Sequence, residues 1–216
     1  MAGAELIDRA MKAQLRRYRD LLVVGMPRLG WKIGFNDTRV QGRLGLDGPL
    51  VGYLDGGRAL RSGDTYSVRP GTRIALEAEV AVRVGGGGAV AAVAPAFELV
   101  NYSLPANSLE GMVEHDLFHE AVVFGRETLP VPIAEDSWPL VRRNGSEVAR
   151  RDPAMLVVQP TRAVRDVAAT LARYGEQLEK DDWLILGSLI PPFPVHAGDT
   201  IEADFGPLGR LSLTIT

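Results

Sequence analysis

Two glutamates, Glu77 and Glu79, stand two residues apart in a segment (73–84) whose even-numbered positions are all apolar. This alternation predicts a β-strand, in which side chains at i and i+2 share a face with Cα atoms roughly 6 to 7 Å apart. Two carboxylates presented side by side can serve a polyvalent cation. The alternative is the solvated face of an edge strand, and the pair alone favours this alternative.

A third acid, Glu98, lies in the apolar run Pro95-Ala-Phe-Glu-Leu-Val100. An ionised carboxylate is costly to bury unless a metal, a cation or strong hydrogen bonds compensate it. Glu77, Glu79 and Glu98 together therefore favour a shared site for a hard cation. Mg²⁺ or Mn²⁺ is favoured, because only carboxylate oxygens are on offer and softer metals prefer imidazole and thiolate. Calcium stays open, although no loop has EF-hand spacing.

Two histidines, His115 and His119, fall one turn apart on a helix predicted over about 109–120, with Asn107 or Ser108 as its cap. This spacing can supply two zinc ligands. Because the H-E-x-x-H arrangement is absent, a partly exposed polar helix face is favoured. Their titration near neutral pH still makes both candidates for acid/base work if they face the acids.

Composition narrows the function classes. The chain has 216 residues, 27 acids against 24 bases and a net charge of −3, with no polybasic block. These values disfavour electrostatic binding to nucleic acid or an anionic membrane, so a small-molecule partner is expected. No apolar run approaches a membrane span of about 20 residues, no signal-peptide pattern opens the chain, and cysteine is absent. We expect a cytoplasmic protein without thiol chemistry.

Hydrophobic periodicity predicts a mixture of helices and strands. An amphipathic helix is expected over 4–22, and β structure without helix over 30–84. The glycine run 85–88 reads as a hairpin connection, and a second helix is expected over 160–174. Later strands are expected over 183–187, 200–205 and 210–215. We predict one α+β domain spanning 1–216, with a helical segment at 1–29 and a β-rich core at 30–216 on a mixed or largely antiparallel sheet.

Several motifs occur in an order that resembles the 2-keto-4-pentenoate hydratase branch of the fumarylacetoacetate hydrolase superfamily. The first half of the chain contributes Gly30-Trp-Lys-Ile-Gly34, Val40-Gln41, Leu44-Gly-Leu-Asp47, Leu76-Glu-Ala-Glu-Val80 and Pro95-Ala-Phe-Glu-Leu-Val100. The second half contributes Gly175-Glu-Gln-Leu178, Gly187-Ser-Leu189, Pro192, Pro194-Val195, Gly198-Asp199 and Phe205-Gly-Pro-Leu-Gly209. The likeness runs from about residue 30 to the end of the sequence.

This resemblance implies a fold, a cofactor and site residues. The fold is a rolled mixed β-sandwich core with flanking helices, like the C-terminal domain of fumarylacetoacetase. Mg²⁺ or Mn²⁺ would be held by the acids that map to Glu77, Glu79 and Glu98, and homo-oligomers are usual. Lys32 matches an active-site lysine, where the motif outweighs the ordinary reading as a surface lysine. Ser188 matches a serine able to bind substrate; on sequence alone it would be a turn residue.

The sequence also departs from the family pattern. Leu50 stands where an Asp is common, Asn101 begins a segment that is often Asp-Ser-Arg, and Ile190 replaces a common Thr. The usual Ala-Asp-Asn-Ala helix start is replaced around Glu114-His-Asp-Leu117. The predicted metal site is therefore better preserved than the predicted substrate pocket.

The resemblance implies a divalent-metal-dependent lyase that acts on a small 2-oxo acid or its dienol through a metal-stabilised enolate, most simply a hydratase. His115 or His119 could replace lost acid/base groups. Decarboxylation or C–C bond hydrolysis on the same scaffold is the second hypothesis. A non-catalytic homologue that binds a metal-chelating acid, or a partner subunit, is the alternative from a different class.

Overall fold

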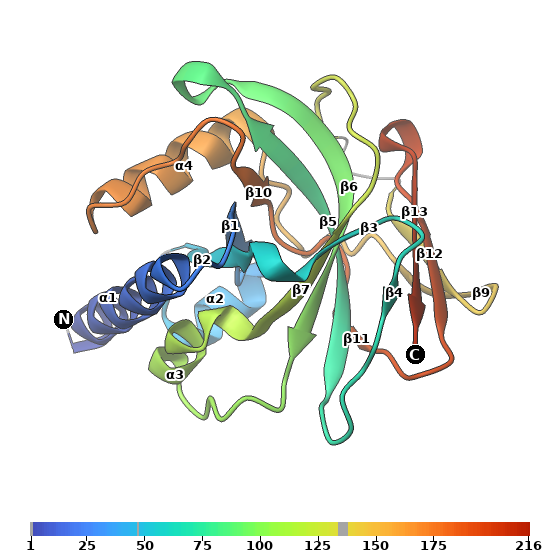
Figure 1. The fold of residues 1–216 in the computed structure, drawn as a ribbon, viewed down its shortest axis with the longest axis horizontal. Helices are drawn as coiled ribbons and strands as arrows, with labels where there is room; N and C mark the ends of the chain where they lie inside the picture. Colours follow the sequence, from blue (N-terminus) through green and yellow to red (C-terminus); the bar gives the residue numbers. More distant parts are fainter. Residues whose placement is uncertain (1, 47, 134–137) are drawn as a thin grey trace.

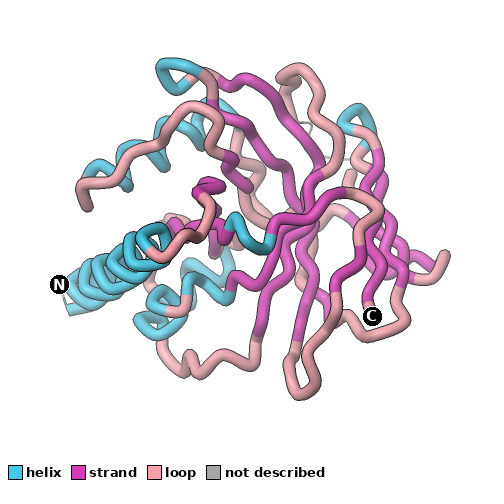
Figure 2. Tube along the Cα trace, viewed as in Figure 1, coloured by secondary structure: helices cyan, strands magenta, loops and turns pink. Residues whose placement is uncertain are grey.

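The computed structural model describes residues 2–46, 48–133 and 138–216, and this part of the chain contains two β-sheets and four α-helices (Figures 1 and 2). The helices are α1 (Ala2–Val23), α2 (Thr38–Leu44), α3 (Leu109–Glu114) and α4 (Pro160–Ala172). Short 3-10 turns are η1 (Gly56–Arg58), η2 (Gly86–Gly88), η3 (Asp116–Phe118) and η4 (Gly206–Leu208).

The larger sheet has eight described strands in the order β2-β1-β10-β5-β6-β7-β3, with β11 also paired to β5. They are β1 (Arg28–Gly34), β2 (Leu50–Asp55), β3 (Ala59–Arg61), β5 (Ile74–Val84), β6 (Val90–Asn101), β7 (His119–Phe124), β10 (Trp183–Ile185) and β11 (Phe193–Pro194). The pairs β1/β10 and β3/β7 are parallel and the others antiparallel, so the sheet is mixed.

The smaller sheet has five described strands in the order β4-β13-β12-β8-β9. They are β4 (Thr65–Tyr66), β8 (Leu140–Arg143), β9 (Ser146–Arg150), β12 (Thr200–Asp204) and β13 (Arg210–Ile215). In Figure 1 this sheet lies on the right, α1, α3 and α4 lie on the left, and the long β5–β6 ribbon runs between them. The α+β class is confirmed, whereas the finer description as a rolled sandwich and the division at residue 30 stay predictions.

The β5–β6 hairpin carries the three acidic residues of the candidate site. The two strands pair along almost their full length, and Glu77 lies directly opposite Glu98 in the register. The predicted glycine connection is confirmed: Gly87 in η2 has φ 65, a left-handed conformation that glycine adopts without a side-chain clash. Core side chains cover both faces of β5, and its even positions are all buried. A strand buried on both faces has no solvated side.

Aromatic side chains attach α1 to the larger sheet. Tyr18 of α1 is fully buried, with its ring centroid 4.9 Å from that of Trp31 on β1 and 5.1 Å from that of Tyr53 on β2. Strand β2 also contacts β7, although β1, β10, β5 and β6 separate the two strands in the sheet order. The sheet therefore curls, and this curvature brings β1 over the β5–β6 hairpin.

Two expectations about helices are wrong. Helix α2 lies within the region expected to hold β structure alone; Asp37 caps its first turn by accepting from Arg39 N, and Gly45 ends it in the left-handed conformation. The predicted helix over 109–120 ends at Glu114, because residues 116–118 all have positive φ and β7 begins at His119. The buried side chain of Asp116 accepts the backbone N–H of Tyr53 at 2.8 Å, which fixes this turn to β2.

Candidate active site

Three carboxylates from the β5–β6 hairpin converge. Glu77, Glu79 and Glu98 each offer an oxygen, and these atoms all lie within 4.8 Å of one another. Glu79 and Glu98 are 0% and 1% exposed, while Glu77 is half-buried. The alternative of a solvated edge strand is wrong, because β5 is internal to the sheet and Glu79 is fully enclosed.

The acid cluster is electrostatically unsatisfied by the protein alone. Burial raises the pKa of Glu77 to about 7, and it raises the pKa of Glu79 well above its ordinary value; the neighbouring Glu98 charge adds to both shifts. Gly187 N donates to Glu79 Oε2 at 2.7 Å, but Glu79 Oε1 is buried with no hydrogen-bond partner among the described residues. Three clustered carboxylates with an orphaned oxygen are a donor set that fits a hard divalent cation.

Two basic side chains contact the third acid. The ammonium of Lys32, on β1, forms a buried ion pair with Glu98 Oε1 and also donates to Leu117 O at 3.2 Å. His119 Nδ1 lies 2.7 Å from the same Glu98 oxygen. Burial would raise the pKa of Glu98, but the charge of Lys32 and the hydrogen bond with His119 lower it. Glu98 is therefore ionised in this arrangement.

The surroundings of Lys32 act on its ionisation in opposite directions. Burial disfavours its ammonium, but the carboxylates of Glu98, Asp116 and Glu77 outweigh this effect and raise the pKa of Lys32 above its ordinary value. Lys32 therefore lies in a buried ion pair with Glu98.

A small cavity opens onto this cluster. It encloses about 190 Å³ and is lined by Lys32, Ile33, Gly34, Phe35, Asn36, Asp37, Val40, Glu77, Glu98, Val100, Tyr102, Leu117, Phe118, Met155, Ser188 and Pro192. Drug-sized ligands occupy sites of roughly 300 to 1,000 Å³, so this cavity suits a smaller molecule. Its charged lining residues are Lys32, Asp37, Glu77 and Glu98, and apolar and aromatic side chains form most of the remaining wall.

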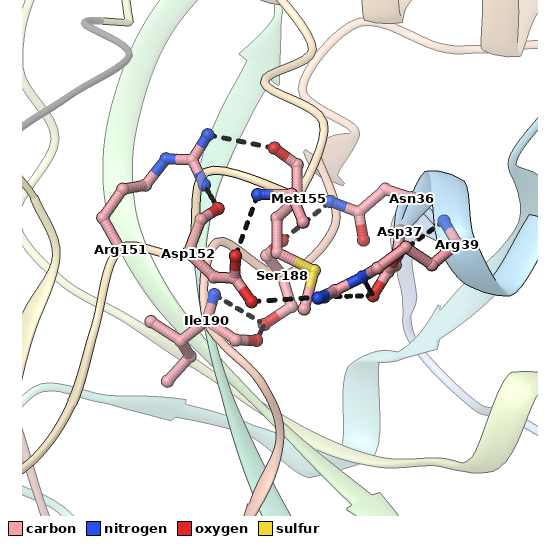
Figure 3. Close-up of polar contacts among 9 residues, drawn as sticks. Asn36, Asp37, Arg39, Arg151, Asp152, Met155, Ser188 and Ile190 are labelled. Carbon is pink, nitrogen blue, oxygen red and sulfur yellow. Dashed lines mark hydrogen bonds and ion pairs between the residues drawn. The ribbon is translucent and has the colours of Figure 1, made fainter.

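Ser188, predicted to bind substrate, lines this cavity, but its hydroxyl is already engaged. Ser188 Oγ donates to Ile190 O at 2.7 Å, while Ser188 O accepts from Asn36 Nδ2 at 2.7 Å (Figure 3). The adjacent Gly187 has φ 91, and a Cβ there would lie 2.6 Å from the Asn36 side chain. This tight turn delivers the Gly187 N–H to Glu79.

The two histidines have different surroundings. His119 touches Glu98, as a candidate acid/base group should, although it begins β7 instead of lying on a helix. His115 caps the C-terminus of α3, and neither histidine is among the residues that line the cavity. The expectation that they share one helix face is wrong, because the left-handed turn at 116–118 separates them.

The sequence reasoning missed the turn that completes the site. Asp116 is buried and accepts from Gln14 Nε2 at 2.7 Å as well as from Tyr53 N, and burial raises its pKa to about 8. Leu117 and Phe118, which follow it, line the cavity. An aspartate followed by two apolar residues was the available signal in the sequence, but the helical periodicity around it favoured a continuous helix.

The departures from the family pattern differ in their relation to the cavity. Leu50, Asn101 and Ile190 are absent from its lining, whereas Tyr102 and Leu117, from the altered segments 101–103 and 114–117, line it. Ile190 is fully buried in the main core, and Leu50 packs against that core. Asn101 donates to Glu120 Oε2 at 3.1 Å, in a separate network.

Among the described helices, none is long and apolar enough to cross a bilayer.

Known proteins resemble the chain in sequence. No family model matches it. It is 24% identical over 228 residues to the TodF product hydratase of Pseudomonas putida, covering 98% of this chain and 85% of that protein. It is 25% identical to 2-keto-4-pentenoate hydratase 1 of Dechloromonas aromatica, covering 95% of this chain and 84% of the relative.

Solved structures extend the likeness to the fold. The 4-oxalocrotonate decarboxylase of Pseudomonas putida G7 superposes with a TM-score of 0.87 at 20% identity, covering 97% of this chain and 86% of that one. Fumarylpyruvate hydrolase of Pseudomonas aeruginosa gives 0.68 at 16% identity, covering 88% and 90%. The resemblance predicted from sequence is confirmed: the chain is similar to 2-keto-4-pentenoate hydratases over nearly its whole length and has the fold of the fumarylacetoacetate hydrolase superfamily.

Proposed function

We propose that this protein is a divalent-metal-dependent lyase acting on a small 2-oxo acid or its dienol, most simply a hydratase of a 2-hydroxydienoate. One observation carries the proposal: three converging glutamates and a buried lysine adjoin a cavity of about 190 Å³. The relatives named hydratases agree with the reaction class.

Glu77, Glu79 and Glu98 would hold the metal. Their oxygen-only donor set suits Mg²⁺ or Mn²⁺, and related folds have been solved with magnesium and adipate and with Mn²⁺ and pyruvate. A divalent ion bound there would act as a Lewis acid on the oxygens of a chelating 2-oxo acid.

The protein's own groups would bind and orient the substrate. Lys32 forms a buried ion pair with Glu98, so its positive charge can attract the substrate carboxylate and stabilise negative charge that develops on a neighbouring oxygen. The apolar wall, including Phe35, Phe118 and Met155, would enclose the carbon chain and exclude bulk water. His119 Nδ1 lies 2.7 Å from Glu98 Oε1, so this side chain would fix the orientation of that carboxylate.

Decarboxylation or C–C hydrolysis of a related 2-oxo acid is the second candidate, favoured by the fold shared with 4-oxalocrotonate decarboxylase. The same binding groups would serve either reaction. The non-catalytic alternative is motivated by the departures from the family pattern, of which Leu50, Asn101 and Ile190 do not line the cavity and Tyr102 and Leu117 do.

Product analysis separates these candidates. The Mg²⁺- or Mn²⁺-loaded protein is incubated with a panel of 2-hydroxydienoates and 2-oxo acids, and products are identified by NMR. Hydration retains every carbon and adds one water, whereas decarboxylation releases CO₂ and hydrolysis releases a second acid. We expect hydration. No turnover of any member, with the metal demonstrably bound, would contradict the lyase proposal and favour the binding homologue.

A further inference from the structure

Tyr102 lies at one end of the cavity wall that β6 contributes. It directly follows β6, four residues after Glu98, and Glu98, Val100 and Tyr102 all line the cavity. Side chains at i, i+2 and i+4 of an extended chain share a face, so the Cα atoms of Glu98 and Tyr102 are roughly 13 Å apart along this wall. Tyr102 is therefore placed beyond the candidate metal site, on the side where the far end of a bound molecule can lie.

Both the ring and the backbone of Tyr102 are held in place. The ring contacts that of Phe118, another lining residue, edge-on with a centroid distance of 5.2 Å. Tyr102 N donates to Arg73 O at 2.9 Å, and Tyr102 O accepts from the guanidinium of Arg73. Tyr102 is 36% exposed. It therefore has a defined position where the cavity meets solvent.

The hydroxyl of Tyr102 has no hydrogen-bond partner among the described residues. Three other described lining residues carry side-chain donors, and each of these donors already has a partner in the protein. Lys32 pairs with Glu98, while Asn36 and Ser188 donate to backbone carbonyls (Figure 3). The remaining polar side chains of the lining are carboxyl groups, which accept hydrogen bonds when ionised. Tyr102 therefore supplies the free side-chain donor of the described lining.

This hydroxyl keeps its proton at neutral pH. Burial raises the pKa of Tyr102 above its ordinary value, and the charges of Glu77 and Glu98 add to the shift. The action of these two carboxylates also means that the hydroxyl lies within electrostatic range of the candidate metal site. A neutral phenol can donate one hydrogen bond and accept another, so it suits a water molecule or an alcohol better than an anion that must be neutralised.

The hydration proposed above creates an alcohol at a defined carbon. Water adds to an unsaturated 2-oxo acid at C-4, the far carbon of the double bond conjugated with the 2-oxo group. A C–O bond forms at C-4, the π bond between C-3 and C-4 breaks, and one proton of the water ends on C-3. When the 2-oxo acid group binds beside Lys32 and the glutamates, C-4 is directed away from them. Val100 is apolar, so Tyr102 is the first polar side chain beyond Glu98 on the β6 wall.

We propose that the Tyr102 hydroxyl forms a hydrogen bond with the oxygen that hydration adds at C-4, and so binds the incoming water and the hydroxyl of the product at one position. This inference rests on the proposed function, since it assumes that the 2-oxo acid group binds beside Lys32 and the glutamates. Tyr102 orients the oxygen and does not carry the proton that ends on C-3. It belongs to the segment 101–103 that departs from the family pattern, so this contact is a feature of this chain.

The test compares two probes of equal chain length, 4-hydroxy-2-oxopentanoate and 2-oxopentanoate, which differ only in the hydroxyl at C-4. Binding to the Mg²⁺-loaded protein is measured by calorimetry, with the two enantiomers of the hydroxy acid measured separately. We expect one enantiomer to bind about fivefold tighter than 2-oxopentanoate, as one neutral hydrogen bond provides.

Variants identify the source of this preference. Tyr102→Phe removes only the hydroxyl and keeps the ring that contacts Phe118. It should abolish the preference for the hydroxy acid, while the affinities for 2-oxopentanoate and for Mn²⁺ stay within about twofold of the unmodified protein. Tyr174→Phe is the matched control, because Tyr174 packs against the main core and does not line the cavity. It should leave the preference unchanged.

Three outcomes would overturn the assignment of Tyr102: no preference for either enantiomer in the unmodified protein, a preference that survives in Tyr102→Phe, or an equal loss of preference in Tyr174→Phe. Each of these leaves the proposed function standing, because the 2-oxo acids still bind. Failure of both probes to bind the metal-loaded protein would instead overturn the proposed function and the role of Tyr102 together.

Discussion

Two buried acidic sites lie close together on the larger sheet, and the protein treats them differently. Glu120 on β7 accepts hydrogen bonds from Arg58 at 2.6 Å, Arg69 at 2.9 Å, Tyr66 at 3.1 Å and Asn101 at 3.1 Å. Burial opposes its ionisation, but these donors prevail and lower its pKa. The hydrogen-bonding capacity and the charge of this single carboxylate are satisfied by groups of the protein.

The cluster of Glu77, Glu79 and Glu98 is the opposite case. Three carboxylates share one lysine and one histidine, and the pKa values of Glu77 and Glu79 are raised. Glu120 is paired with donors of the protein itself, as expected for an acid that stabilises the fold. The three glutamates of the hairpin have too few such partners, so we interpret them as a binding site for a cation.

Replacing Glu79 should have the largest effect on activity. Glu79→Gln removes a metal-binding charge while retaining an acceptor for Gly187 N, so we expect kcat/KM to fall at least about a hundredfold with the fold intact. Steady-state kinetics with saturating Mg²⁺ measures the loss. Glu120→Gln is the control and should keep most of the activity. Similar losses in both variants would erase the distinction between the two sites.

Replacing Lys32 should have the second-largest effect on activity. Lys32→Met keeps the length of the side chain but deletes the only cation of the described cavity lining, and we expect kcat/KM to fall about a hundredfold. Circular dichroism of the same sample checks folding. Lys32→Arg should recover part of the activity if positive charge is what matters. Full activity in Lys32→Met would remove Lys32 from the site.

The Glu120 site should instead respond in stability. Glu120→Ala leaves Arg58 and Arg69 without their acid, and we expect the free energy of unfolding to fall by about 2 kcal/mol, below the 3 to 5 kcal/mol for a fully buried pair because both arginines are partly exposed. Urea denaturation measures this value. A loss as large in Glu79→Gln as in Glu120→Ala would contradict our assignment of the two roles.

The smallest expected effect is a pH dependence in the metal-free protein. Folding raises the pKa of Glu77 from 4.5 to about 7, so over this interval the native state holds a proton that the unfolded chain has lost. The Glu77 contribution therefore makes stability fall as pH rises from about 4.5 to about 7. Urea unfolding in the presence of a chelator, at pH 5 and 7.5, should show a shallower decline in Glu77→Gln. Equal declines in the unmodified protein and in Glu77→Gln would show that folding does not raise the pKa of Glu77.

Local sequence patterns predicted the strand-borne parts of the site. Alternation placed Glu77 and Glu79 on one strand, and the apolar flanks of Glu98 indicated that it is buried. That Glu98 lies directly opposite Glu77 depends on the register of the hairpin, which the glycine connection sets. Lys32 came from a motif, because nothing in its own composition distinguishes a lysine that the curvature of the sheet brings to Glu98 from one on the surface.

Tertiary contacts decided the parts that were missed. The helix predicted through His115 and His119 is interrupted where the buried Asp116 bonds to Tyr53 N and Gln14, neighbours that lie far away in sequence. Helix α2 did carry local signals, an Asp cap at Asp37 and a glycine end at Gly45, but the glycine-rich segments around it favoured turns. The contact between Arg39 and Asp152 could not be predicted, because the two residues lie 113 positions apart in the sequence.

Metal affinity tests the central claim most directly. Mn²⁺ is titrated into the protein and the free ion is followed by electron paramagnetic resonance, for the unmodified chain, Glu79→Gln and Glu120→Gln. We predict one Mn²⁺ per chain, displaced by Mg²⁺, with affinity weakened at least about a hundredfold in Glu79→Gln and nearly unchanged in Glu120→Gln. No stoichiometric binding by the unmodified protein, or equal binding by Glu79→Gln, would contradict the account.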